Sequence, residues 1–339
     1  MKIQERVPLS QHTTLRTGGP ARYFVEAVSL EEVREAVRLA QRHGLPTRLL
    51  GSGSNVLASD AGFDGVVIKM ATRGIQETAS GNSTVVVTAE AGESWDALVE
   101  FAVARGLGGL EAMSLIPGTV GAAVIGNIGA YGAEVKDTLQ WAEAMDLRSG
   151  RNCQFAADEC RFSYRWSHFK TAEGRGFVIT RAAFALRRDA APNLRYKDVR
   201  EKLAASGVAE PTIRDVREAV ISIRQGKLPD LARIGTAGSF FKNPVLPRDR
   251  YEALAIRFPG LPGFDEGNGL RKVPLGWILD KVCGMKGLQR GRVGTHPDQA
   301  LVIVNDGGTA TEVEALAYEI ATAVKETTGI TIEWEVEHL

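Results

Sequence analysis

The chain has 339 residues, of which 44% are hydrophobic and 24% charged, so it is long enough for two or three domains with ordinary globular cores. Its 41 basic and 41 acidic side chains cancel, which excludes binding to nucleic acid through an overall excess of positive charge. The sequence has no apolar run of membrane-spanning or signal-peptide length, and its three cysteines and five histidines form neither CxxC nor HExxH pairs. We therefore expect a cytoplasmic protein without a membrane segment, a disulfide framework or a metal ion.

Residues 1–70 are expected to form a small α/β lobe. Ser29 and Glu32 have the spacing of a capping box at the start of a helix, and Gly44 is suited to end that helix. Apolar residues recur on one face of this helix at Val33, Ala36, Val37 and Ala40. The strands expected in this lobe are 47–50 and 66–68.

Two further regions follow. In residues 71–218 the pattern predicts strands at 83–89, 141–146 and 177–186 and a helix from Ser94 to Gly106. In residues 219–329, which follow a helix that begins at Thr212, it predicts a helix near 275–283, a strand at 301–305, and a long helix between Thr309 and Gly329. Alternation over 330–336 predicts a half-buried strand, and residues 330–339 are expected to join the first lobe.

The pentapeptide Gly51-Ser52-Gly53-Ser54-Asn55 follows a predicted strand. Its small residues would let backbone amides approach a diphosphate, and successive amides can form an anion-binding nest. A tight turn explains the same residues equally well. The pentapeptide is neither a GxGxxG that opens a helix nor a P-loop, which disfavours a Rossmann site.

A second glycine-rich segment runs from Ile116 to Gly132. Its glycines would let the main chain press against a flat ligand, with isoleucine and valine side chains as apolar walls. A tightly packed helix with glycines at its crossings is an equally good interpretation of this segment.

Motifs in a fixed order carry a family resemblance. GSGSN, IPGTVGAAVIGNIGAYG, CRFSYRWSHFK and GTAGSFFKNP together resemble the UDP-N-acetylenolpyruvoylglucosamine reductase (MurB) family, from about Thr14 to Glu337. Any one of these motifs is moderately specific, whereas all of them in this order are very specific. The tyrosine-bearing segment 193–197 resembles the first type of this family, in which a tyrosine loop folds over the substrate.

The resemblance implies an α+β fold, namely a two-lobed FAD-binding module of the vanillyl-alcohol-oxidase (PCMH) type with a C-terminal α/β substrate-binding domain. It also implies FAD, NADPH as hydride donor, and the small-molecule substrate UDP-N-acetylglucosamine enolpyruvate. Because no histidine or cysteine is placed for a covalent flavin link, we expect non-covalent FAD, and we expect a monomer. By position, FAD contacts are expected at Gly51, Ser52, Gly53, Ser54, Asn55, Gly118, Thr119, Gly121, Ala123, Ile128, Gly129, Ala130 and Arg224. Substrate contacts are expected at Tyr131, Tyr164, Tyr196, Lys227, Asn243 and Gln289, and the catalytic positions are Ser239, Arg165 and Glu335.

The three catalytic residue types suit the reduction of an enol ether. Hydride arrives at the β-carbon, so negative charge spreads from the α-carbon into the carboxylate, where a preorganised donor contributes about 3–4 kcal/mol. The planar fork of Arg165 fits a carboxylate, and Glu335 can donate a hydrogen bond to the developing enolate if it is protonated. Ser239, a poor acid in water, can protonate the α-carbon beside a localised carbanion.

Simpler explanations exist for each of these residues. Ser239 can be a turn residue, Arg165 an exposed strand residue, and Glu335 a solvated residue on the polar face of a strand. Two other functions also fit the motifs in part. A different FAD oxidoreductase of the same fold, such as an alcohol or hydroxy-acid oxidase, would consume oxygen with an alcohol, and a non-catalytic sugar-nucleotide-binding relative would be indifferent to Ser239→Ala.

Overall fold

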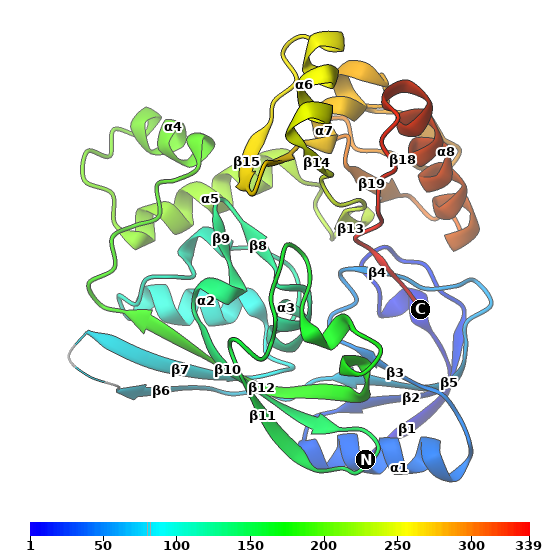
Figure 1. The fold of residues 1–339 in the computed structure, drawn as a ribbon. Coiled ribbons are helices and arrows are strands. Elements are labelled where there is room, and N and C mark those ends of the chain that lie inside the picture. Colours follow the sequence, from blue (N-terminus) through cyan, green and yellow to red (C-terminus); the bar gives the residue numbers. More distant parts are fainter. Residues whose placement is uncertain (80, 82) are drawn as a thin grey trace. The chain divides into compact units, whose positions relative to one another are not determined.

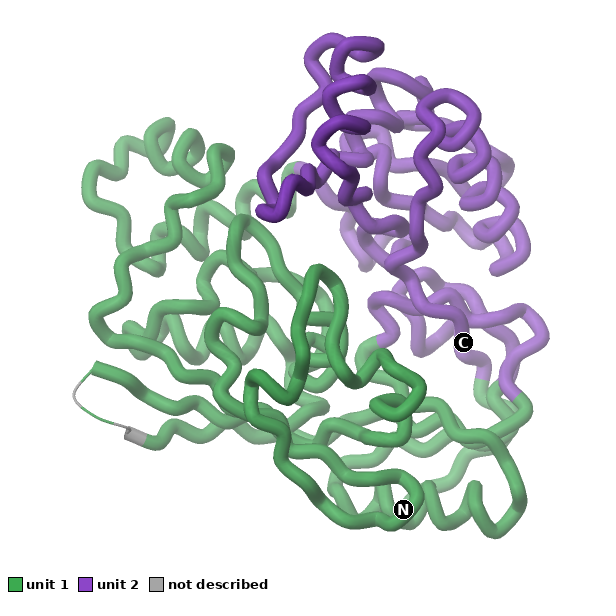
Figure 2. The backbone as a smooth tube through the Cα atoms, in the orientation of Figure 1, with its two compact units in different colours: residues 1–7, 21–52, 64–226 green, residues 8–20, 53–63, 227–339 purple. Residues whose placement is uncertain are grey.

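The structure, a computed structural model, describes residues 1–79, 81 and 83–339. The chain forms two compact units, shown in different colours in Figure 2. Unit 1 comprises residues 1–7, 21–52 and 64–226, and unit 2 comprises residues 8–20, 53–63 and 227–339. Each unit buries a hydrophobic cluster of its own.

Unit 1 contains two sheets and a short hairpin (Figure 1). The first sheet has the order β1-β2-β5-β3, with β1 Ile3–Pro8, β2 Pro20–Ala27, β3 Thr47–Leu50 and β5 Phe63–Met70. The second has the order β11-β10-β12-β7-β6, with β6 Ile75–Ala79, β7 Thr84–Glu90, β10 Leu139–Asp146, β11 Asn152–Ala156 and β12 Phe177–Arg187. The hairpin pairs β8 Gly129–Ala130 with β9 Ala133–Glu134. The helices are α1 Leu30–Arg42, α2 Trp95–Ala104, α3 Val120–Gly126, α4 Lys197–Ala205 and α5 Ile213–Lys227.

Unit 2 is built around an antiparallel sheet of order β13-β19-β18-β17. Its strands are β13 Gly235–Ser239, β17 Gln289–Arg290, β18 Val293–Thr295 and β19 Val302–Asn305. A smaller sheet of order β14-β16-β15 contains β14 Val245–Pro247, β15 Phe264–Gly267 and β16 Leu270–Lys272. The helices are α6 Arg248–Arg257, α7 Leu275–Trp277 and α8 Ala310–Thr328, and a π-helical turn occupies Ile278–Val282. The parallel pair β4 Val56–Leu57 and β20 Glu337–His338 also belongs to this unit.

Helix α1 confirms the first helix predicted from the sequence. The Ser29 hydroxyl accepts from the Glu32 N–H, but the Glu32 carboxylate reaches the N–H of Val28, one residue before the cap. The predicted apolar face is buried against the first sheet (Figure 1), and Gly44 follows the helix with a φ of +62°. Helix α8 likewise has both hydrogen bonds of its predicted capping box and ends at Gly329, which has a φ of +71°.

The strand predicted over 330–336 is wrong, although the alternation that suggested it is real. Ile330, Ile332 and Val336 are buried, yet the segment forms only an isolated bridge between Trp334 and Phe241 before β20 begins. Alternating burial needs only an extended chain with one face on a core, whereas a strand also needs a continuous partner. The division of the first 218 residues into two lobes stays a prediction.

Among the described residues, no helix is both long enough and apolar enough to cross a membrane.

Candidate active site

The glycine-rich segment 116–132 forms a helix, as one of its two interpretations expected, and then a hairpin; its contact with a flat ligand stays a prediction. Residues 120–126 form α3, and the chain then turns sharply at Asn127, which has a φ of +41°, into the β8–β9 hairpin. Asparagine tolerates this left-handed conformation better than most residues because its short amide bonds locally. The fully buried Asn127 amide donates to Glu134 at 3.0 Å and to the Ser163 carbonyl at 2.9 Å, so it fixes the hairpin to the CRFSYRW motif.

The two glycine-rich motifs meet in unit 1 at Gly51. A Cβ at this position would lie 2.7 Å from the Thr119 hydroxyl oxygen, so a larger residue would have to displace the Thr119 side chain. Thr119 precedes α3, and Gly118 just before it has a φ of +145°, which glycine adopts readily. Ser52 is exposed and Ile128, Gly129 and Ala130 are half-buried, so main chain and small side chains dominate this region. This composition fits a ligand that the backbone approaches closely, as FAD requires.

Packing also explains part of the glycine-rich pattern. A Cβ on Gly121 would lie 2.9 Å from the Ala91 Cβ, and Ala123 is only 2% exposed. These two positions must therefore be small for the core of unit 1, whatever ligand the segment binds.

Gly53, in unit 2, has a φ of +69° and no room for a Cβ, which would lie 2.1 Å from the His12 carbonyl oxygen. We expect Gly53→Ala to lower the free energy of unfolding by more than about 2 kcal/mol, because left-handed strain of about 1–2 kcal/mol adds to a clash with backbone. Gly284→Ala is the matched control, since Gly284 has a φ of +63° and open space around it. Urea denaturation of both variants measures the difference, and equal losses would contradict the clash.

Arg165 lies in unit 1 in a left-handed conformation, with a φ of +55°. Its Nη2 donates to the Gly129 carbonyl at 2.8 Å, and its guanidinium lies 5.3 Å from the centre of the Tyr164 ring. Such a backbone conformation costs free energy for a residue with a side chain, and strain of this kind clusters at functional sites. Arg165 is thus held against the glycine-rich segment and is not a simple exposed strand arginine.

Tyr131, Tyr196 and Arg224 form a second cluster in unit 1. The two tyrosine rings lie edge to face with their centres 5.2 Å apart, and Tyr131 also hydrogen-bonds the Arg224 side chain. Burial lowers the pKa of the half-buried Arg224, while Tyr131 and Asp96 act in the opposite direction. Tyr196 directly precedes α4, which packs on α5 through a small apolar cluster. The tyrosine-bearing segment is therefore a folded part of unit 1.

Ser239, at the end of β13 in unit 2, is exposed. The pairing of β13 with β19 slips between Thr236 and Ser239, and Gly238 within the bulge has a φ of +73°. Bulges of this kind redirect a side chain and are common beside active sites.

A chain of hydrogen bonds in unit 2 links Asn55 to Glu335 and then to the residue after Ser239. The Asn55 amide donates to the Glu335 carbonyl at 2.9 Å, and the Glu335 N–H donates to the Phe240 carbonyl at 2.9 Å. The backbone carbonyl of Asn55 also accepts a hydrogen bond from the Glu337 N–H at 3.0 Å. Two sequence motifs and the C-terminal segment therefore share one hydrogen-bond network, and Glu335 and Ser239 belong to adjoining stretches of main chain. Half-buried Ser54 lies beside Asn55 in the chain.

The remaining predicted substrate residues of unit 2 are dispersed. Asn243 accepts from the Leu275 N–H at 2.9 Å and so helps to begin α7. Gln289 is exposed on the edge strand β17, and Lys227 is exposed at the end of α5. The Asn243 side chain thus has a structural role at the start of α7, and its contact with the substrate stays a prediction.

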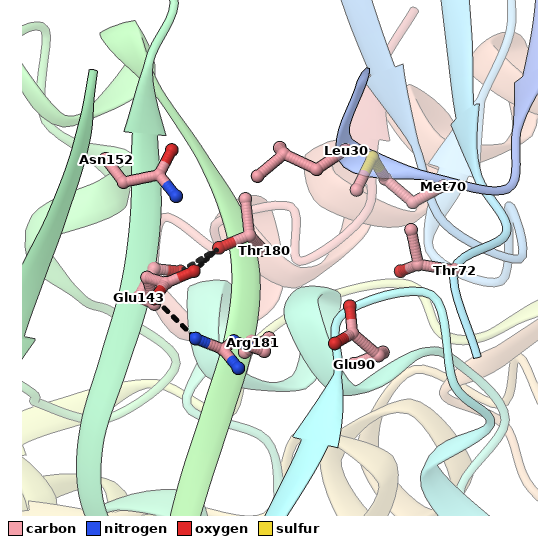
Figure 3. Close-up of a pocket in the computed structure, with 8 residues that line it drawn as sticks. All are labelled: Leu30, Met70, Thr72, Glu90, Glu143, Asn152, Thr180 and Arg181. Atoms are coloured by element: carbon pink, nitrogen blue, oxygen red, sulfur yellow. Dashed lines mark hydrogen bonds and ion pairs between the residues drawn. The ribbon is translucent and has the colours of Figure 1, made fainter. Parts of the chain in front are cut away.

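A cavity of about 250 Å³ in unit 1 contains none of the predicted site residues (Figure 3). Thr180 and Arg181 both hydrogen-bond Glu143 on its wall, and burial raises the pKa of Glu90 opposite them. Two carboxyl groups are a poor environment for a diphosphate, so this cavity is not a candidate nucleotide site. It is lined by Leu30, Met70, Thr72, Glu90, Glu143, Asn152, Thr180 and Arg181.

Sequence reasoning missed the buried polar residues that support these segments. Glu111 is only 2% exposed, and its carboxylate accepts from the Gly109 N–H at 2.7 Å and from the Asn193 N–H at 3.2 Å. The start of the tyrosine-bearing segment is thereby bound to residue 111. Its position in the apolar run Gly-Gly-Leu-Glu-Ala-Met was the available signal, because buried carboxylates need partners.

Comparisons with known proteins identify the fold class. The family "FAD binding domain" matches residues 21–155. 6-Hydroxy-D-nicotine oxidase from Arthrobacter nicotinovorans shares the fold at a TM-score of 0.50 and 17% identity, over 92% of this chain and 81% of that one. The chain is therefore a flavoprotein of the vanillyl-alcohol-oxidase fold class with an added C-terminal domain.

Closer relatives define the family. Residues 230–339 match "UDP-N-acetylenolpyruvoylglucosamine reductase, C-terminal domain". The chain is 44% identical to the UDP-N-acetylenolpyruvoylglucosamine reductase of Ralstonia nicotianae over 98% of both chains, and 42% identical to that of Pseudomonas aeruginosa over 99% of this chain and 98% of that one. The crystal structure of the Thermus caldophilus enzyme superposes with a TM-score of 0.68 at 28% identity, over 100% and 99% of the two chains. The chain belongs to the UDP-N-acetylenolpyruvoylglucosamine reductase (MurB) family.

Proposed function

We propose that this chain catalyses the NADPH-dependent reduction of UDP-N-acetylglucosamine enolpyruvate to UDP-N-acetylmuramate, with non-covalently bound FAD, as a cytoplasmic monomer. The observation that best supports the proposal is the network that joins Asn55, Glu335 and Phe240, because it connects an expected cofactor loop with the catalytic position Glu335 and with the residue that follows Ser239. Membership of the UDP-N-acetylenolpyruvoylglucosamine reductase family also supports this reaction.

For the cofactor, we assign the diphosphate to residues 51–55 and the flavin to residues 118–131 with Arg224. The close approaches at Gly51 and Gly53 support backbone rather than side-chain contacts. When bound, FAD supplies a ring that takes a hydride from NADPH and passes it to the substrate. Arg224 brings a half-buried cation whose charge suits an electron-rich ring.

For the substrate, we assign nucleotide and diphosphate contacts to Tyr196, Lys227, Asn243 and Gln289, and we assign further substrate contacts to Tyr131 and Tyr164. The edge-to-face contact between Tyr131 and Tyr196 supports a tyrosine-bearing segment of the first family type. We also propose two FAD-binding lobes, residues 1–70 joined by about 330–339 and residues 71–218, and a substrate-binding domain of residues 219–329.

In the reaction itself, Arg165 holds the substrate carboxylate, where negative charge accumulates after hydride reaches the β-carbon. A protonated Glu335 donates a hydrogen bond to the resulting enolate. Ser239 then gives its hydroxyl proton to the α-carbon, which completes the addition of hydrogen across the double bond.

An absorbance spectrum tests the proposal directly. The purified protein is expected to be yellow, to lose that colour with NADPH under anaerobic conditions, and to regain it when the enolpyruvyl substrate is added. Protein that takes up no FAD would refute the proposal. Rapid oxygen consumption with an alcohol would favour an oxidase of the same fold, and a yellow protein that the substrate does not reoxidise would favour a non-catalytic sugar-nucleotide-binding relative.

A further inference from the structure

Leu115 has an unusual backbone at the entrance to the glycine-rich segment. Its φ is +58°, in the left-handed region that costs a residue with a side chain about 1–2 kcal/mol. The next residues, Ile116 and Pro117, have little freedom to correct the direction of the chain, because proline fixes its own φ and restricts the residue before it. The conformation of Leu115 therefore sets the path by which the main chain reaches Gly118.

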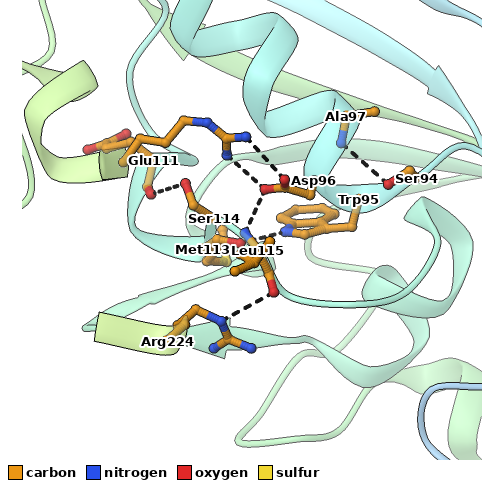
Figure 4. Close-up of polar contacts among 10 residues, drawn as sticks. Ser94, Trp95, Asp96, Ala97, Glu111, Met113, Ser114, Leu115 and Arg224 are labelled. Atoms are coloured by element: carbon orange, nitrogen blue, oxygen red, sulfur yellow. Dashed lines mark hydrogen bonds and ion pairs between the residues drawn. The ribbon is translucent and has the colours of Figure 1, made fainter. Parts of the chain in front are cut away.

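Two side chains hold the peptide groups of Leu115 from opposite sides (Figure 4). Its N–H donates to Asp96 Oδ1 at 2.6 Å, and its carbonyl accepts from Arg224 Nε at 3.2 Å. Both peptide groups are thus paired with ionised groups, and such hydrogen bonds are stronger than neutral ones. Together they offset the cost of the left-handed backbone.

Asp96 is itself fixed by Arg217 of α5. Arg217 Nη1 and Nη2 donate to Asp96 Oδ1 and Oδ2 at 2.7 and 3.1 Å, and the two side chains are only 12% and 26% exposed. Burial acts to raise the pKa of Asp96, but the bonds from Arg217 and Leu115 and the charges of Arg217 and Arg224 outweigh it, so this pKa is lowered. Asp96 therefore stays ionised between two arginines that both come from α5.

A simpler role for Asp96 is to stabilise the start of α2, where a carboxylate interacts favourably with the helix dipole. That role leaves its geometry unexplained. Ser94 already caps α2 by accepting from the Ala97 N–H, whereas both oxygens of Asp96 are directed to Arg217 and one of them to Leu115. The Asp96 carboxylate therefore fixes the backbone of Leu115, from which residues 116–118 follow.

We propose that Asp96 is a positioning residue for FAD, which holds Leu115 in its left-handed conformation and so directs main chain 116–118 and Arg224 toward the flavin. This inference rests on the proposed function only in taking Gly118 and Arg224 as part of the FAD site. Asp96 acts through Leu115 and the two arginines.

The test measures FAD affinity of the apoprotein by flavin fluorescence, together with thermal unfolding of the same apoprotein. Asp96→Ala is expected to weaken FAD binding by about tenfold to a hundredfold, the loss found when residues that orient metal ligands are removed. Asp96→Asn, which keeps an acceptor for the Leu115 N–H, is expected to lose less. The control is Asp189→Ala, which removes an exposed two-bond pair with Arg187, both bonds being 2.9 Å, and is expected to leave FAD affinity unchanged.

Rescue separates positioning from general stability. Glycine adopts a positive φ at no steric cost, so Leu115→Gly added to Asp96→Ala is expected to restore at least part of the lost FAD affinity. If Asp96→Ala cannot be purified folded, the same addition is made to Asp96→Asn. FAD affinity equal to that of Asp189→Ala, or no recovery with Leu115→Gly, would overturn the inference while leaving the proposed function intact. Wild-type protein that binds no FAD would overturn both.

Discussion

The Ser239→Ala variant is expected to lose colour with NADPH at the wild-type rate but to regain it with the enolpyruvyl substrate about 10²- to 10⁴-fold more slowly, the range over which a positioned acid contributes. Only the second of these steps needs a proton at the α-carbon. Stopped-flow absorbance follows both steps separately, because each changes the colour of the protein.

Ser239→Ala is expected to leave the local fold of β13 unchanged. Ser239 is exposed at the end of β13, and the adjacent bulge is stabilised by Gly238, whose N–H donates to the Thr236 hydroxyl at 3.1 Å. Removing the Ser239 hydroxyl leaves that bond intact. Ser206→Ala, at an exposed serine after α4, is the control and should change neither step. Unchanged reoxidation in Ser239→Ala would show that another group delivers the proton.

Helices with strong local signals were predictable from the sequence. In α1 and α8 the cap, the apolar periodicity and the final glycine all indicate the same ends, and these features depend on residues close in the chain. The segment 330–336 was not predictable in the same way. Its alternation reports which side chains face a core, whereas its hydrogen bonds depend on Phe240, Phe241 and Lys242, about ninety residues earlier.

The site residues were identifiable as residue types, but their supports were not. Asn55 was expected to serve the cofactor, yet its amide donates to Glu335, a residue 280 positions away. The left-handed Leu115 and Arg165 carry no local sign of their conformation, since neither is glycine, asparagine or aspartate. Such backbones exist only because long-range contacts compensate their cost, and a single sequence does not display those contacts.

The Glu335→Ala variant is expected to slow the substrate-dependent step by about 10²- to 10³-fold, the usual loss when one donor to a developing oxyanion is removed. Glu335→Gln should lose less, because its amide still donates a hydrogen bond although it carries no titratable proton. Both substitutions preserve the hydrogen bonds that the backbone carbonyl and N–H of residue 335 form with Asn55 and Phe240. The difference in rate between the two variants therefore reports on the side chain alone.

Glu333→Ala is the matched control for the Glu335 variants. Glu333 lies two residues earlier, is exposed, and forms an ion pair with Lys242 at 3.0 Å. Exposed pairs of this kind contribute about 0–1 kcal/mol to stability, so its loss should leave the rates of both steps unchanged.

If Glu335→Gln is as slow as Glu335→Ala, Glu335 acts as an ionised acceptor rather than as a donor. In that case Arg165 alone must hold the negative charge of the enolate, and Arg165→Met should then abolish the substrate-dependent step.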